Sequence, residues 1–309
     1  MEHKPLLFIA LSMLALAGCQ PAAPPAPGDT TAPRVTAATP GDGAVGVSKN
    51  DAVVLTFSEP MDTAATEAAF ELLAPDGTPL PVGFSWEDED RRLVATPAAP
   101  LAYSPNASYL TYRYRLAATA KDPAGNPLAA AFEADFSTMR LLGFQIESEA
   151  ARDGAVTSDG VVDAAGASAF LGDTDAASAS RVFFSFPLDG LPAGTESVVS
   201  AELRLYAQSA TGSPDDLQYR MGHLAYGELD AGDYAATEGE NQPIFPHATG
   251  TWRFGVRGWV ASDWDGGRAR FQIRLRSSND GDGTSDGYVL NTAESADNKP
   301  TLQVAVYAP

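Results

Sequence analysis

The chain has 309 residues, of which 44% are hydrophobic and 19% charged, a composition typical of globular proteins. Its formal net charge of −20 argues against binding to nucleic acid or to anionic membrane surfaces, because Lys and Arg supply the affinity for phosphate groups. Cys19 is the single cysteine, which excludes an intramolecular disulfide and a cysteine metal site.

The N-terminal segment is apolar and ends at this cysteine. The apolar run at 6–16 is too short to cross a hydrocarbon core of ~30 Å as a permanent helix, which is typical of a cleaved signal peptide. Its end, Leu16-Ala17-Gly18-Cys19, resembles the bacterial lipobox. The resemblance implies removal of residues 1–18 and a lipid anchor on Cys19, and Gln20 resembles the signal for outer-membrane retention. The alternative is an ordinary secretory signal with a chance cysteine.

Residues 19–33 are rich in Pro and Ala and lack side chains that could form a core. Such a segment favours extended polyproline II structure, at about 3.1 Å per residue. We expect a tether that holds the first folded domain away from a membrane, at the cell surface or outer membrane.

Residues 34–140 show short strands of alternating polarity separated by turn residues, which predicts an all-β sandwich. One segment differs, because residues 62–69 are rich in good helix formers and start with Asp62, a favourable N-cap. The strands are predicted at 52–57, 91–96, 109–116 and 131–137.

Four blocks of this region resemble the bacterial Ig-like module of S-layer and other surface proteins. They occur in the expected order: Thr39-Pro40-Gly41-Asp42-Gly43-Ala44, Leu55-Thr56-Phe57-Ser58-Glu59-Pro60-Met61-Asp62, Lys121-Asp122-Pro123-Ala124-Gly125-Asn126-Pro127 and Phe136-Ser137-Thr138. The resemblance implies an Ig-like spacer or adhesive sandwich without catalytic machinery.

Residues 141–309 continue the alternating pattern over more strands than an Ig domain needs, which favours a larger jelly-roll-like β-sandwich. At 200–207 the residues Ala201, Leu203 and Leu205 form one face, and Glu202, Arg204 and Tyr206 the other. Within 252–264, apolar residues at helical spacing before Gly266 predict one short helix.

Several blocks of this second region resemble the DNRLRE-type β-sandwich, although the hexapeptide that gives the family its name is absent. They are RVFFSF at 181–186, LPAG at 191–194, AELRLY at 201–206, LDAGDY at 229–234, FQIRLR at 271–276, DGDGTSD at 280–286 and PTLQV at 300–304. The resemblance implies a secreted or cell-wall domain allied to carbohydrate-binding modules, and leaves the ligand open.

The turn at 279–287 is a candidate calcium site. Asp280, Asp282 and Asp286 alternate on a glycine-bent loop, and oxygen ligands at such spacing can converge on Ca²⁺. Glu294 or Asp297 could complete the shell if the hairpin returns there. The pattern lacks the Glu at position 12 of an EF-hand, and the plain alternative is a polar turn.

Tyr206 is the best candidate for a sugar-stacking platform, because Leu203 and Leu205 already define the inward face of its strand. Arg204, Arg274 and Arg276 are candidate binders of hydroxyl or carboxylate groups on outward strand faces. Other aromatic candidates, which the alternative interpretation places in the core, are Trp252, Trp259, Trp264, Tyr226 and Tyr234.

Catalytic motifs are absent from the sequence. It lacks a Gly-x-Ser-x-Gly elbow, a phosphate loop and a dinucleotide fingerprint, and His223 has no neighbouring nucleophile in the sequence. We expect a non-enzymatic, lipid-anchored surface protein that binds carbohydrate or another envelope component. The alternatives are a purely structural envelope protein and an extracellular hydrolase with unrecognised carboxylates.

Overall fold

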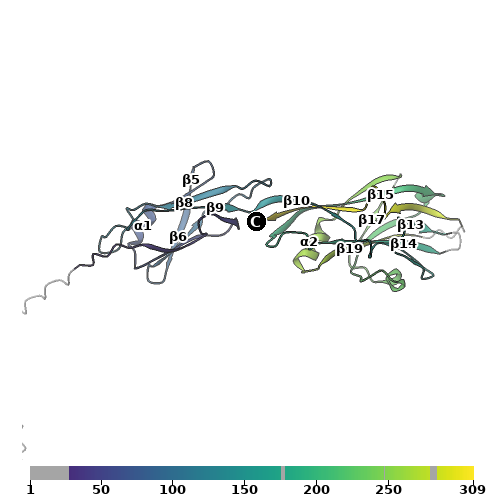
Figure 1. Cartoon of the computed structure of the whole chain (residues 1–309), viewed down its shortest axis with the longest axis horizontal. Coiled ribbons are helices and arrows are strands. Elements are labelled where there is room, and N and C mark those ends of the chain that lie inside the picture. Colours follow the sequence, from purple (N-terminus) through teal and green to yellow (C-terminus); the bar gives the residue numbers. More distant parts are fainter. Residues whose placement is uncertain (1–27, 175–177, 247, 279–283) are drawn as a thin grey trace, which may run out of the picture.

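A computed structural model describes residues 28–174, 178–246, 248–278 and 284–309. The lipobox with Cys19, and the predicted calcium ligands Asp280 and Asp282, lie outside the described residues. Figure 1 shows two β-rich bodies arranged end to end, with the first described residues at the far end of the first body and the C-terminus at the junction between the two. Within the described residues, no helix has the length and apolarity needed to cross a bilayer.

The first body is a sandwich of two sheets, as the alternating pattern predicted. Its four-stranded sheet has the spatial order β1 (Val35–Thr39), β3 (Val53–Phe57), β7 (Arg92–Pro97) and β6 (Val82–Glu87). Its five-stranded sheet has the order β2 (Ala44–Val47), β9 (Phe132–Thr138), β8 (Thr111–Leu116), β4 (Phe70–Leu73) and β5 (Pro79–Leu80). Only the β2–β9 pair among these is parallel.

The core between these sheets is aliphatic and aromatic. Leu55 and Tyr114 are fully buried, and the rings of Tyr112 and Phe136 stack with centroids 5.7 Å apart. Burial of each such side chain contributes roughly 1.5–3 kcal/mol. The predicted helix is confirmed as α1 (Thr63–Ala69). Asp62 is its N-cap, as predicted, since its side chain accepts a hydrogen bond from the backbone N–H of Ala65 at 3.0 Å.

The second body is one curled sheet of twelve strands. Nine follow one another in the order β10 (Arg140–Glu147), β21 (Thr301–Ala308), β15 (Ser197–Thr211), β20 (Asp286–Asn291), β13 (Ser168–Asp173), β14 (Ala179–Pro187), β19 (Arg270–Ser277), β16 (Tyr219–His223) and β17 (Asn241–Ile244). The remaining three are β11 (Gly154–Thr157), β12 (Val162–Asp163) and β18 (Gly250–Gly255).

Strand β15 makes the sheet curl. Its first part pairs with β21, and after a bulge between Ala207 and Ser209 its last part pairs with β20. The two layers that result enclose one large core, which contains Leu203, Phe184 and Phe271. This is the jelly-roll-like sandwich that the sequence predicted.

Short helices cover the ends of the second body. The predicted helix is confirmed as α2 (Arg257–Asp265), which buries Val260 and Asp263. The described residues also form two 3-10 helices, η1 (Pro214–Asp216) and η2 (Ala231–Ala235). His223 on β16 holds α2 in place, because its Nε2 lies 2.8 Å from Oδ2 of Asp263 and its ring stacks on Trp259.

The two bodies touch at a packed junction. Only Met139 separates β9 of the first body from β10 of the second. The Tyr103 hydroxyl contacts the Glu196 carboxylate across the junction, and the Tyr103 ring packs edge-on against Tyr307 at 4.9 Å. Arg140 donates to the backbone carbonyls of Ala107 and Pro309.

Candidate functional site: a groove on an outer sheet face

Four neighbouring strands of the second body, β10, β21, β15 and β18, present a polar outer face. Their register places side chains in rows across the strands, because residues paired in a ladder point to the same side of a sheet. One row is Gln145, Gln303, Glu202 and Gly255, and the next is Glu147, Thr301, Arg204 and Arg253. Tyr206 follows two residues after Arg204 and is paired with Thr251.

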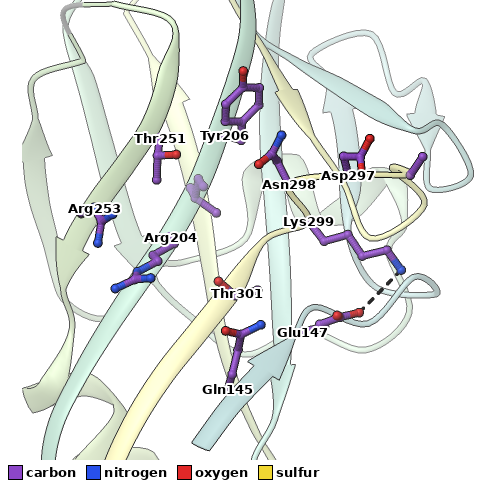
Figure 2. A pocket seen from close by; sticks show the side chains of 12 residues that line it. Gln145, Glu147, Arg204, Tyr206, Thr251, Arg253, Asp297, Asn298, Lys299 and Thr301 are labelled. Atoms are coloured by element: carbon purple, nitrogen blue, oxygen red, sulfur yellow. Dashed lines mark ion pairs between the residues drawn. The ribbon is translucent and has the colours of Figure 1, made fainter.

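A hollow of about 450 Å³ lies over these rows, walled at one end by the loop that precedes β21 (Figure 2). We call it, with its two continuations, the sheet-face groove. One continuation of about 670 Å³ shares Gln145 and Arg204 with it, and the other, of about 410 Å³, shares Tyr206 and Asp297. The central hollow is lined by Gln145, Glu147, Arg204, Leu205, Tyr206, Thr251, Arg253, Ala296, Asp297, Asn298, Lys299 and Thr301.

The groove runs along the strands. Its lining extends on β15 from Ser200 to Gln208, which at a rise of about 3.3 Å per residue corresponds to roughly 26 Å. Such a groove matches an extended, polar ligand better than a compact one.

Ion pairs link most of the charged side chains in the groove. Glu202 Oε1 lies 2.5 Å from Nε of Arg204 and 3.2 Å from Nη1 of Arg253, and Lys299 Nζ lies 3.5 Å from Oε2 of Glu147. Hydrogen bonding from Arg204 lowers the pKa of Glu202, so this carboxyl is ionised at neutral pH. An ionised, ion-paired carboxylate is suited to binding hydroxyl groups and is a poor general acid.

The structure brings two of the four predicted ligand-binding residues together, since Arg204 and Tyr206 both line the groove. Their strand alternates as expected, with Leu203 and Leu205 buried behind them. The rest of the groove could not be found from sequence, because β10, β18 and β21 reach it only through long-range pairing.

The other two arginines do not reach this face. The prediction that β19 has an outward face is wrong, because the segment 224–240 covers it and Arg274 is only 4% exposed. Nη2 of Arg274 lies 2.7 Å from Oε1 of Glu238, and Arg276 pairs with the same carboxylate. Arg274 also donates to the carbonyls of Asp233 and Tyr234, so its guanidinium has a structural role.

The remaining aromatic candidates mostly pack inside the second body. Trp252 is buried and donates to the carbonyl of Ala248, while Trp259 and Trp264 pack against the large core at α2. Tyr226 and Tyr234 belong to a smaller cluster around Phe183. This agrees with the alternative interpretation that most aromatics are structural.

The predicted calcium ligands Asp286 and Glu294 lie at opposite ends of β20. Asp286 begins the strand, Glu294 follows its far end, and its six residues span roughly 16 Å, so the hairpin does not bring the two carboxylates together. The Asp286 carboxylate accepts hydrogen bonds from the backbone of Ser213 and the hydroxyl of Thr284. Calcium binding by Asp280, Asp282 and Asp286 stays a prediction.

Glu294 instead lies beside Asp153. Burial and the neighbouring Glu294 carboxyl raise the pKa of Asp153 to about 6, against hydrogen bonds from Ser148 and Ala293 that lower it. A second acidic cluster lies in the first body, where carboxylate oxygens of Asp29, Glu59 and Asp122 are within 4.8 Å of one another. Acidic clusters on a surface are common without a metal, so this proximity alone defines no metal site.

The fold defines an all-β protein with an Ig-like first sandwich and an elongated polar groove on the second body. Residues 29–138 match the family model described as a bacterial Ig-like domain. The match agrees with the predicted Ig-like sandwich, fits a cell-surface or structural protein, and suggests a non-enzymatic role.

Solved structures give distant likenesses only. One is the methionine-rich copper resistance protein PcoC from Escherichia coli, with 16% identity over 35% of this chain and 99% of that one, at a TM-score of 0.28. Another is the N-terminal part of the bacterial S-layer protein SbsC, with 17% identity over 52% and 42% of the two chains, at a TM-score of 0.27. Carbohydrate-binding modules of the β-sandwich superfamily match with 14% identity over 91% and 98%, at a TM-score of 0.17.

Likeness at these identities and TM-scores does not define a function. No curated protein matches the chain.

Proposed function

We propose that the protein is a non-catalytic lipoprotein of the bacterial cell envelope whose second domain binds a polysaccharide in the sheet-face groove. Cys19 would carry the lipid, residues 19–33 would form the tether, residues 34–140 the Ig-like spacer, and residues 141–309 the binding domain. The end-to-end arrangement supports this order, because the chain enters the first body at the pole opposite the second (Figure 1).

The observation that carries the proposal is the polar groove, with an aromatic ring and two arginines on the neighbouring strands β15 and β18 (Figure 2). A tyrosine ring offers an apolar face for stacking on the CH groups of a sugar and a hydroxyl for hydrogen bonding. A guanidinium donates two parallel hydrogen bonds, which suits vicinal hydroxyls or a uronate carboxylate. Gln145, Thr251 and Asn298 add neutral partners.

The groove is open and its lining is mostly polar, so we expect modest affinity at one site. Many anchored copies on one surface would raise the effective affinity for a polymer, because each bound repeat holds the next one near a second groove. An envelope polysaccharide is therefore the ligand class that the groove fits best.

A glycan array of neutral and uronate-containing oligosaccharides tests the proposal, with the soluble chain lacking residues 1–19 as the probe. We expect binding that Tyr206→Ala strongly weakens and that Phe245→Ala leaves unchanged. Phe245 is the matched control because it is 72% exposed on the same domain and lines a different hollow, beside Ile244. Uniformly negative arrays would reject polysaccharide binding and leave the purely structural envelope role.

A further inference from the structure

Asp153, which is buried, and Glu294, which is half-buried, form an acidic pair that the groove does not use. Asp153 precedes β11, and Glu294 lies in the loop between β20 and β21. Asp153 is 0% exposed, and its Oδ2 accepts hydrogen bonds from the Ser148 hydroxyl at 2.8 Å and from the Ala293 backbone N–H at 2.7 Å. Two segments 140 residues apart are thus held together at this carboxylate.

One oxygen of each carboxylate receives no such hydrogen bond. Oδ1 of Asp153 and Oε2 of Glu294 are both buried, and in the described part of the chain no N–H or O–H group donates to either of them. Among the described residues, no Lys or Arg forms an ion pair with either carboxylate, because Arg152 pairs with Glu149 and Lys299 pairs with Glu147. Buried polar atoms in native proteins nearly always have a partner, and a buried carboxylate oxygen without one is costly.

We propose that Asp153 and Glu294 bind a calcium ion through these two oxygens. Two adjacent carboxylates supply negative charge that a divalent cation neutralises, and Ca²⁺ prefers oxygen ligands in flexible numbers. The alternative metals fit less well, because Zn²⁺ is bound mostly through His and Cys, and neither residue belongs to this pair. This pair is separate from the predicted ligand Asp286, which begins β20 at the end away from Glu294.

The local backbone supports a fixed position for Asp153. The next residue, Gly154, has φ of +136°, and a Cβ there would lie 2.0 Å from the carbonyl oxygen of Asp163. Only glycine can follow Asp153 on this path, so its carboxylate is directed by the chain as well as by Ser148 and Ala293.

The ion would also stabilise a wall of the groove. Asp297 and Asn298, which line the groove, follow Glu294 in the same loop (Figure 2). Binding of Ca²⁺ at Glu294 would therefore order the loop without touching the polysaccharide. The calcium site does not depend on the proposed function, because it can be measured without any glycan.

The test is calcium titration of the soluble chain lacking residues 1–19, by calorimetry and by thermal unfolding in CaCl₂ against EDTA. We expect a rise in the melting temperature with Ca²⁺ that Asp153→Asn and Glu294→Gln each remove. Loss of a direct ligand should weaken calcium affinity by more than the about 10–100-fold that loss of an outer partner causes.

The same variants distinguish a lost ligand from a damaged fold. In EDTA, Asp153→Asn should melt at the same temperature as the wild type or higher, because an amide removes the repulsion and can donate to Glu294. A melting temperature well below the wild type in EDTA would overturn the proposal, and so would a calcium shift that persists in Asp153→Asn.

Asp282→Asn is the matched control in the acidic turn. Loss of the calcium shift there, with retention in Asp153→Asn, would assign the ion to the turn and reject this site. No calcium shift in the wild type, together with greater stability in mild acid, would mean that the pair shares a proton instead and would also reject it.

Discussion

Nη2 of Arg274 and Oε1 of Glu238 lie 2.7 Å apart, in side chains that are 5% and 7% exposed. Arg276 contacts the same carboxylate, so Glu238 neutralises a basic cluster beneath the segment 224–240. Charged side chains point into the molecule here because a covering segment supplies their partner. The pair fixes the segment 224–240 to the face of β19 that carries Arg274.

Glu238→Gln should destabilise the protein by about 3–5 kcal/mol, because removal of the carboxylate leaves the buried guanidinium of Arg274 without compensation. Urea unfolding measures this. Glu228→Gln, an exposed acid in the same segment, should change the stability by less than about 0.5 kcal/mol. Equal, small effects of the two substitutions would show that Glu238 is not the essential partner.

The same pair gives a pH dependence. Burial raises the pKa of Glu238, but hydrogen bonds and charges of Arg274 and Arg276 outweigh burial and lower it overall. Because the pKa is lower in the folded state, ionised Glu238 stabilises the fold fully above the unfolded pKa of about 4.3. This contribution is lost as the pH falls from there through the folded-state pKa. Unfolding free energies from pH 7 to pH 3 should fall less steeply in Glu238→Gln than in the wild type.

Asp263→Ala should release helix α2. The Asp263 side chain is 2% exposed, and its two oxygens face His223 and Arg268. We expect a loss of about 3 kcal/mol, because both partners lose a buried carboxylate. Asp265→Ala on the same helix, at an exposed position, is the control and should be nearly neutral in the same denaturant titration. Equal losses for the two variants would contradict this role.

Gly46→Ala should weaken the junction of the two bodies. Gly46 has φ of +71°, and a Cβ there would lie 2.6 Å from Cβ of Pro309. Gly43→Ala is matched for backbone strain, with φ of +75°, but its Cβ would meet open space. Both variants should lose about 1 kcal/mol from the left-handed backbone.

Only Gly46→Ala should alter the arrangement of the two bodies. Small-angle X-ray scattering should show a wider distribution of interatomic distances for this variant than for Gly43→Ala. Identical scattering from the two variants would show that the contact with Pro309 does not hold the junction.

Local patterns predicted the elements that depend on neighbours in sequence. The N-cap of α1 at Asp62, helix α2, and the alternation of β15 that exposes Arg204 and Tyr206 are all properties of a few consecutive residues. The Ig-like sandwich followed from motifs with an expected order. These features needed no knowledge of which strands pair.

The errors and omissions arise from long-range contacts. The alternation of β19 looks like that of β15, but a segment distant in sequence buries the polar side of β19 through Glu238. The approach of Asp153 to Glu294 likewise depends on contact between two segments that are 140 residues apart along the chain, as the hydrogen bond from Ala293 to Asp153 shows. The position of Glu294 after Asp286 in sequence suggested a shared ion, whereas strand β20 separates the two.

Isothermal calorimetry with the strongest oligosaccharide from the array tests the sheet-face groove most directly. Tyr206→Ala and Arg253→Ala should each raise the dissociation constant about tenfold or more. A tenfold rise corresponds to a loss of about 1.4 kcal/mol of binding free energy. Phe245→Ala and Arg220→Ala, which change an aromatic and an arginine at another hollow of the same domain, should bind like the wild type. Groove variants that keep wild-type affinity would contradict the account.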